Sequence, residues 1–421
     1  MPEQKVMNRS LVVVGAIMIQ LCLGAIYAWS AFTKDLVDAG WTKTQTQAVF
    51  SAGLATFAVV MVIAGRMMPK VGPRKLAIAG GLVLGAGYAL AGLVGGTSFG
   101  MILLLVGFVG GAGIGLAYVV PIAVGMRWYP DKKGLITGLA VAGFGFGATI
   151  WVKLAGNWGN LLATYGLSKT FTIYGIVFAV TVCIGGIWMM FPPEGWLPAG
   201  YTPPKPAAGK STGAVDFKSG EMLVTPQYYM ILLCFAFGAS AGLMSIGLMK
   251  LFPMEALQAA GMSKEAAAAV AGTAMGVFYA LANGIGRIAW GSVSDKLGRK
   301  KSIMIMMATQ GVVVFLFPWM AGTTGLLYLG ATLIGFNFGG NFALFPTMTA
   351  DTFGTKFVGQ NYGWVFLAYG IGGIFGPMLG GKLGDMKNFP LAFRICAGLC
   401  ILAAIIIALV KPPQKAASTA A

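Results

Sequence analysis

The sequence contains no histidine and few charged residues, and these two absences restrict its chemistry first. Without histidine, the chain lacks the commonest metal ligand and the commonest proton relay near neutral pH. Only 10% of its residues are charged, whereas soluble domains carry about a quarter. A chain so poor in charge cannot cover a water-facing surface, so lipid has to cover it instead. The five cysteines all lie in apolar runs, which indicates small core residues rather than disulfides or a metal site.

Apolar residues, by contrast, make up 57% of the chain, and the mean hydropathy is +0.80. A helix needs about 20 such residues to cross a bilayer. These runs are continuously apolar and do not alternate with period two, which excludes a membrane β-barrel. The sequence therefore predicts an all-α membrane protein with twelve transmembrane helices in two pseudo-symmetric six-helix bundles. The predicted spans are 11–32, 45–64, 76–94, 101–124, 134–152, 171–191, 228–249, 266–293, 303–320, 326–345, 362–380 and 391–410.

The polar segment 192–222, rich in proline and glycine, predicts how the chain is divided. We expect an N-terminal bundle over 1–191, a cytoplasmic linker over 192–222, and a C-terminal bundle with a cytoplasmic tail over 223–421. The excess of 29 basic over 12 acidic residues could suggest a nucleic-acid partner. With the N-terminus inside, however, 19 of these 29 residues fall in cytoplasmic loops and tails. The positive-inside rule therefore explains the charge, places both termini in the cytoplasm and requires no nucleic acid.

A short motif occurs twice, after the second and after the eighth predicted span. Residues 65–75 read GRMMPKVGPRK, and residues 291–300 read GSVSDKLGRK. In both, glycines allow a tight turn and basic residues face the cytoplasm, while Asp295 can accept from a helix end or pair with a cation. A plain basic loop would explain either copy alone. Two copies six helices apart indicate an internal repeat.

The repeated motif, together with the twelve spans, resembles the major facilitator superfamily over the whole chain. The second copy carries the superfamily motif intact, whereas the first has Pro69 where the motif has aspartate. This departure weakens any charge-relay role for the first copy. A narrower resemblance is to the branch that contains the bacterial oxalate–formate antiporter and the monocarboxylate (lactate, pyruvate) transporters. It rests on four segments: RWYPDKKG at 127–134, FKSGEML at 217–223, NFALFP at 341–346 and NYG at 361–363.

Arg287 is the candidate for substrate binding. It lies about 12 Å before Asp295 along the same predicted helix, which places it within the hydrocarbon zone. An arginine there costs about 2.5–3.5 kcal/mol. It could extend toward the inner headgroups, or it could bind a carboxylate through its guanidinium. The resemblance favours the second role, because the family's substrate-binding arginine falls at this position. Asn283 lies one turn earlier on the same face, where eukaryotic monocarboxylate transporters have aspartate.

Other site residues follow from the resemblance. The oxalate–formate antiporter has a lysine eight residues after the asparagine of the NYG segment, where this chain has Tyr369. One cation would then match one carboxylate, which favours a monoanion. Aromatic residues at family-matched positions would form an apolar wall around a short ligand. They are Tyr27, Tyr118, Phe144, Phe338, Phe342 and Phe366.

We therefore expect a secondary transporter that works by alternating access between its bundles, not an enzyme or a receptor. The expected cargo is a small monocarboxylate, with L-lactate as first choice and pyruvate as second, carried with protons. The alternative is an anion exchanger of the oxalate–formate type. All twelve acidic residues lie in loops, tails or span edges, so the substrate itself, Tyr118, Tyr369 or Asn283 with water would have to carry the proton. We expect no cofactor, no metal and a monomer in a bacterial inner membrane.

Overall fold

The computed structural model describes residues 7–32, 35–36, 39–41, 43–156, 158–198, 200–202, 216–249, 251–411 and 413. Within these residues every regular element is a helix. The middle of the predicted linker (203–215) and most of the predicted tail (414–421) lie outside the described residues.

The first half of the chain supplies six membrane-crossing rods, three of which combine α-helix with short 3₁₀ or π segments. In order they are α1 (Ser10–Leu23) with η1 (Gly24–Ala31), α3 (Lys43–Val71), α4 (Pro73–Leu90) with η2 (Ala91–Gly95), α5 (Phe99–Ile102) with η3 (Leu103–Gly110) and α6 (Gly111–Trp128), α7 (Lys133–Ala155), and α8 (Leu161–Gly186).

The second half repeats this pattern after a short helix. Its elements are α9 (Ser219–Leu223), α10 (Pro226–Leu248), α11 (Leu251–Ala259), α12 (Lys264–Thr273) with η4 (Ala274–Tyr279) and α13 (Ala280–Leu297), α14 (Arg299–Met320), α15 (Thr324–Phe353), α16 (Val358–Asp385) and α17 (Phe389–Leu409).

Eleven of the described helical rods are long and apolar enough to cross a membrane. The remaining predicted span corresponds to α15, which has 30 residues but carries Asn337 and Asn341 in its middle. From Asn337 onward nearly every residue of α15 is buried, so protein rather than lipid surrounds its polar side chains. The prediction of a twelve-helix all-α membrane protein is confirmed.

Several predicted boundaries are wrong, and the repeated motif is where this matters most. The second span was predicted to end at residue 64, but α3 continues to Val71, with Pro69 in its last turn. The corresponding stretch of the second copy likewise belongs to α13. The turns themselves are made by Gly72 and Gly298, whose φ angles of 87° and 84° favour glycine. The motif therefore lies on two helix ends rather than in loops.

The sixth predicted span also differs, because α8 begins at Leu161 and ends at Gly186 rather than covering 171–191. A kink at Gly166, with φ 71° and ψ 178°, separates the first turn from the rest of the helix. The end of the predicted linker is helical as well, since α9 begins at Ser219. The polar composition of this segment favoured a loop, so the sequence did not predict this short helix.

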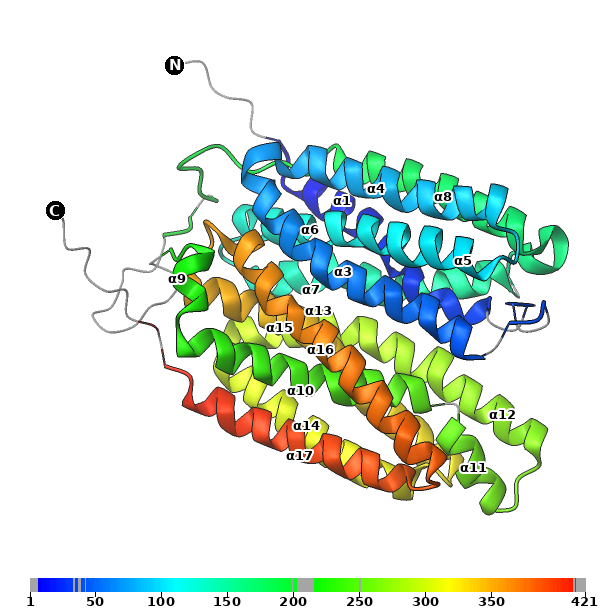
Figure 1. Cartoon of the computed structure of the whole chain (residues 1–421). Helices are drawn as coiled ribbons and strands as arrows, with labels where there is room; N and C mark the ends of the chain where they lie inside the picture. The colour runs from blue at the N-terminus through cyan, green and yellow to red at the C-terminus, as the bar shows by residue number, and fades with distance from the viewer. Residues whose placement is uncertain are drawn as a thin grey trace.

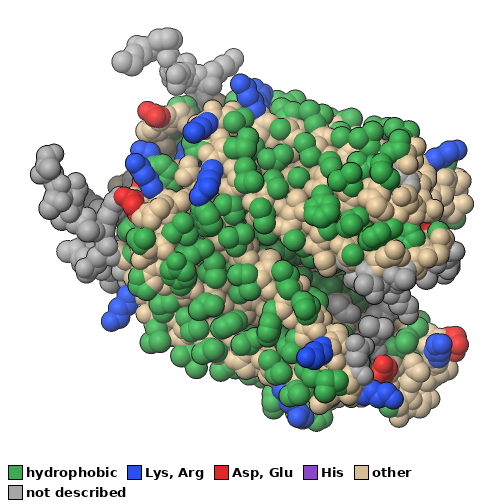
Figure 2. Space-filling model, viewed as in Figure 1, with side chains coloured by type: hydrophobic (Ala, Val, Ile, Leu, Met, Phe, Trp, Pro, Cys, Tyr) green, Lys and Arg blue, Asp and Glu red, His purple; other side chains and the backbone are tan. Residues whose placement is uncertain are grey.

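The rods pack as two bundles that meet along a few helix pairs (Figure 1). In the first bundle α4 packs on α6 and α8, and α1 on α7; in the second, α10 packs on α16, and α14 on α17. The pairs α7–α13 and α3–α16 join the two bundles. Figure 2 shows hydrophobic side chains over the lateral face and charged ones gathered toward its two ends, as a lipid belt requires.

Candidate substrate-binding site

Arg287 lies inside the molecule on α13, with no exposed surface. Its Nε donates to Asn283 Oδ1 at 3.2 Å, one helical turn earlier, and its Nη1 donates to the backbone oxygen of Val141 on α7 at 2.9 Å. Its Nη2 is buried and has no hydrogen-bond partner among the described protein atoms. The guanidinium thus links the two bundles and retains one donor nitrogen for another group.

The charge of Arg287 has no carboxylate partner in the described part of the chain. The ion pairs found there are Arg9–Asp131, Lys133–Asp351, Arg299–Asp295 and Arg299–Asp351. A buried charge without a counter-ion is unfavourable, because desolvation removes more than neutral hydrogen bonds return. An anion that reached Nη2 would relieve this cost.

Aromatic rings surround the guanidinium on two sides. Its Cζ lies 4.1 Å from the ring centroid of Phe342 on α15 and 5.5 Å from that of Phe144 on α7. Ring faces carry negative quadrupole charge, so these contacts partly compensate the cation. They also exclude water from the site.

The other predicted aromatic residues join this cluster from both bundles. Tyr27 and Tyr118 pack edge-on against Phe144, with centroids 5.1 and 5.4 Å away. From the second bundle, Tyr369 lies 5.1 Å from Phe366. Tyr369 also lies 5.5 Å from Phe342, which closes the ring of aromatic side chains. Phe338 stands one layer behind: its ring contacts Phe342 at 5.3 Å and Tyr279 at 6.4 Å.

Three tyrosine hydroxyls face the interior of this cluster. The hydroxyls of Tyr27 and Tyr369 hydrogen-bond to each other and so connect η1 in one bundle with α16 in the other. Tyr27 and Tyr118 also interact with the charge of Arg287. The Tyr118 hydroxyl is buried and makes no hydrogen bond of good geometry among the described residues, although it lies within reach of the Arg287 guanidinium. Arg287 Nη2 and Tyr118 Oη are therefore two donors that a small anion could satisfy together.

Two further residues complete the site and were not predicted. Phe57 on α3 lies 5.0 Å from the rings of both Tyr118 and Phe366, so it joins the two bundles at the site. Gln20 on α1 is fully buried and donates to the backbone oxygen of Tyr118 at 3.1 Å. Phe57 carries no sequence signal, because phenylalanine is common in these spans. A glutamine within an apolar span is a signal that could have identified Gln20.

Glycines on α7 allow the close helix contact that brings Val141 to Arg287. A Cβ on Gly145 would lie 3.0 Å from the Cα of Gly284 on α13 and 3.1 Å from Asn283 Oδ1. One on Gly138 would lie 3.0 Å from the Cα of Ile288. Small residues permit such backbone contacts between membrane helices. The site thus depends on the α7–α13 contact as much as on its own side chains.

Comparison with known proteins agrees with this architecture. The chain is 28% identical over 411 residues to the oxalate:formate antiporter of Oxalobacter formigenes, which covers 96% of this chain and 92% of that protein. It is 23% identical over 442 residues to apicoplast pyruvate carrier 1 of Toxoplasma gondii, covering 84% and 80%. Its fold superposes on a variant of the Escherichia coli fucose:proton symporter FucP with a TM-score of 0.69 and 13% identity, covering 96% and 99%.

The sequence pattern of the Major Facilitator Superfamily matches residues 10–278 and 251–421 of the chain. The predicted resemblance to this superfamily, and to its oxalate–formate and monocarboxylate branch, is confirmed. The chain belongs to the Major Facilitator Superfamily and is a multi-pass membrane transporter, not an enzyme.

Proposed function

We propose that this transporter carries a small monocarboxylate, L-lactate first and pyruvate second, together with protons. The observation that carries the proposal is the buried guanidinium of Arg287, which has a free Nη2 and no carboxylate partner among the described residues. Guanidinium and carboxylate form charge-assisted hydrogen bonds, and a bidentate pair fixes the orientation of the bound group. Tyr118 Oη, which lies within reach of the guanidinium, supplies a further donor.

The number of cations at the site favours one carboxylate over two. A cation–carboxylate contact at 4 Å is worth about 4 kcal/mol at an effective dielectric near 20. Arg287 is the cation within the aromatic cluster, and the neutral Tyr369 stands where a second positive charge would hold a dianion. A dicarboxylate would therefore bury one charge without compensation. Apolar walls from Phe144, Phe342 and Phe366 suit a short alkyl group.

Exchange of anions is the second candidate function. The relative that supports it is the Oxalobacter antiporter, whose name states oxalate:formate exchange. An exchanger always returns loaded, so it never has to move an unpaired Arg287 charge. Net uptake requires the empty site to reorient, and the contacts of Arg287 with Asn283 and Phe342, which belong to the same bundle as Arg287, lower that cost.

We place the protein as a monomer in a bacterial inner membrane with both termini, and hence the α9 end, in the cytoplasm. Basic side chains at that end support this orientation. The bundles are in backbone contact there, since Gly134 on α7 abuts Gly291 on α13. Figure 2 shows the molecule hollowed at the opposite end. In this orientation the bundles touch at the cytoplasmic end, and the hollow lies at the outer end, while the side chain of Arg287 itself stays buried.

Proton coupling separates symport from exchange. In empty proteoliposomes, labelled L-lactate uptake should rise when an inward proton gradient is imposed. In symport each lactate anion enters together with a proton, so the gradient drives the anion inward. Uptake is measured with and without the gradient. Stimulation only by internally loaded anion would contradict symport and favour exchange.

Replacement of Arg287 tests whether its guanidinium binds the substrate carboxylate, a role that we call the clamp. Arg287→Gln should lower L-lactate affinity roughly 10- to 100-fold, because a neutral amide loses a charge-assisted bond of about 1.5–3 kcal/mol. Arg287→Lys keeps the charge but loses the bidentate geometry, so uptake should fall strongly while the protein stays folded. Arg394→Gln on the exposed face of α17 is the matched control and should transport normally. Normal transport by Arg287→Gln would refute the clamp.

Tyr369 tests the charge count. Tyr369→Lys should move binding preference from lactate toward oxalate, since it restores a second cation beside Arg287. Tyr369→Phe removes only the hydroxyl and should not gain oxalate. Ligand-induced thermal shifts with both anions report the preference. If Tyr369→Lys gains no oxalate, cavity size rather than charge selects the cargo.

The effect of Arg287 on thermal stability separates a binding role from a structural role. An unpaired charge kept for substrate binding should lower the stability of the empty protein, whereas a charge that supports the fold should raise it. Arg287→Met replaces the buried cation with an apolar side chain of similar length. Without anion, this variant should unfold a few degrees above the wild type, because the unpaired charge is gone. It should lose the stabilisation that lactate gives the wild type. A lower unfolding temperature than the wild type would assign Arg287 to the structure instead.

A further inference from the structure

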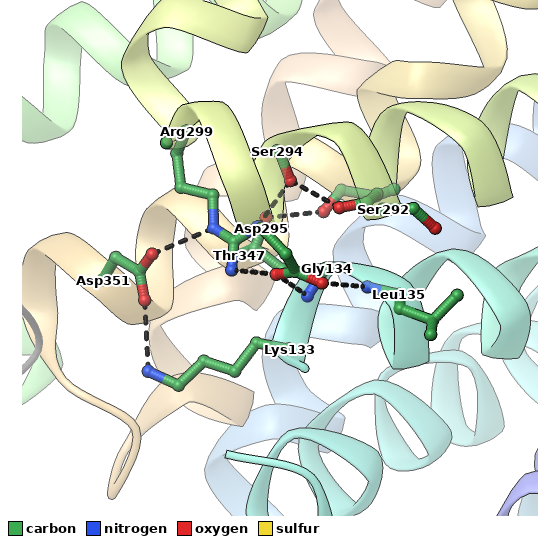
Figure 3. A network of polar contacts seen from close by, with 12 residues as sticks. Lys133, Gly134, Leu135, Ser292, Ser294, Asp295, Arg299, Thr347 and Asp351 are labelled. Atoms are coloured by element: carbon green, nitrogen blue, oxygen red, sulfur yellow. Dashed lines mark hydrogen bonds and ion pairs between the residues drawn. The ribbon is translucent and has the colours of Figure 1, made fainter. Parts of the chain in front are cut away.

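An aspartate side chain bridges α7 and α13 where these helices meet at the α9 end. Asp295, in the last turn of α13, accepts hydrogen bonds from the backbone N–H groups of Gly134 and Leu135 at the start of α7, both at 2.8 Å (Figure 3). These N–H groups have no acceptor within their own helix, and the helix dipole makes them positive. Asp295 therefore holds the second bundle against the first.

Neighbouring ion pairs keep this acid in place and add a second link. Arg299 pairs with Asp295 at 2.6 Å and with Asp351 on α15 at 3.0 Å. Lys133 of the first bundle pairs with the same Asp351 at 3.1 Å. Figure 3 shows that Lys133 and Arg299 approach Asp351 from opposite bundles. Asp295 and Asp351 thus each link the first bundle to the second at this end, and we call such an interaction between the bundles a latch.

The contact between α3 and α16 has the same backbone geometry. A Cβ on Gly291 would meet the carbonyl oxygen of Gly134, and a Cβ on Gly65 would meet the carbonyl oxygen of Gly359. In each pair, a glycine near the end of one helix touches a glycine in the first turn of a helix from the other bundle. The two contacts are equivalent in register.

The acid, however, is missing from the α3–α16 contact. Asp295 lies four residues after its contact glycine, and the residue four positions after Gly65 is Pro69. Proline offers no acceptor side chain to Gly359 or Gln360 at the start of α16. The first turn of α16 has no side-chain cap from its own N-cap residue either.

Another acid stands beside this contact, and it comes from the linker. Asp216 accepts from the backbone N–H of Lys356, two residues before α16, at 3.0 Å. Arg127 at the end of α6 donates to the carbonyl oxygen of the same Lys356 at 2.5 Å and interacts electrostatically with Asp216. Arg127 belongs to the first bundle and Lys356 to the second. Asp216 therefore supports a bond that crosses between the bundles.

The linker is anchored at this point by Asn361. Its Nδ2 donates to the carbonyl oxygen of Phe217 at 2.9 Å, and its Oδ1 accepts from Ser219 Oγ at 3.0 Å. Both Asn361 and Phe217 are buried. The end of the linker is thus held on α16 itself, and Asp216, the residue before Phe217, lies beside the contact.

We propose that Asp216 replaces the acid missing at position 69, where the chain has Pro69. The end of the linker then helps to hold the two bundles together at the α9 end. The α7–α13 contact is latched directly by Asp295, and the α3–α16 contact is latched through Arg127, Asp216 and Lys356. Opening at this end must break both latches. The linker therefore contributes to the balance between the two open states of the transporter.

The test measures bundle separation without substrate, which keeps it independent of the proposed cargo. Spin labels on Lys75→Cys and Lys301→Cys, two exposed positions at the starts of α4 and α14, report the distance in a variant lacking the native cysteines. Asp216→Asn and Asp295→Asn should each raise the ratio of long to short distances about tenfold, as loss of a charge-assisted hydrogen bond does. Asp131→Asn, whose partner Arg9 lies in the same bundle, is the control and should leave it unchanged.

A rescue experiment tests the replacement itself. Adding Pro69→Asp to Asp216→Asn should return the distance distribution to that of the parent, because position 69 is equivalent in register to Asp295, which reaches the start of α7. Pro69→Asn, of similar size but neutral, should not restore it. The proposal is overturned if Asp216→Asn behaves like Asp131→Asn, or if Pro69→Asp and Pro69→Asn have the same effect.

Discussion

The unpaired positive charge of Arg287 is the constraint on which the rest of the site depends. A guanidinium without exposed surface has to be stabilised by what lies around it. Asn283, the carbonyl of Val141 and the faces of Phe342 and Phe144 provide this stabilisation, but they leave Nη2 without a partner among the described residues. Partial compensation lets the empty protein fold and still leaves free energy for an anion to gain.

Under the proposed function, the close contact between the bundles would let one arginine serve alternating access. Val141 belongs to α7 and Arg287 to α13, so the same helix pair that closes the α9 end also completes the site. Separation of these helices breaks the Arg287–Val141 bond and the Asp295 latch together. If substrate binds at Arg287 as proposed, binding at the centre and opening at the α9 end are coupled through this helix pair.

Sequence patterns predicted the features that depend on local composition or on spacing along one helix. The apolar runs gave the twelve spans, and a spacing of four residues put Asn283 and Arg287 on one face of α13. Features that depend on contacts between helices were not predictable in this way. Phe57 and the carbonyl of Val141 reach the site only because of how the bundles meet. The predicted spans ended too early in α3 and α13, because their last turns contain polar residues. A helix that leaves the membrane can continue in water, so hydropathy does not mark its end.

A structure of the protein with bound L-lactate tests the central claim most directly. The account predicts that the lactate carboxylate lies within hydrogen-bonding distance of Arg287 Nη2 and Tyr118 Oη, inside the cluster formed by Phe144, Phe342 and Tyr369. Lactate bound elsewhere, with Arg287 Nη2 still unpartnered, would contradict it.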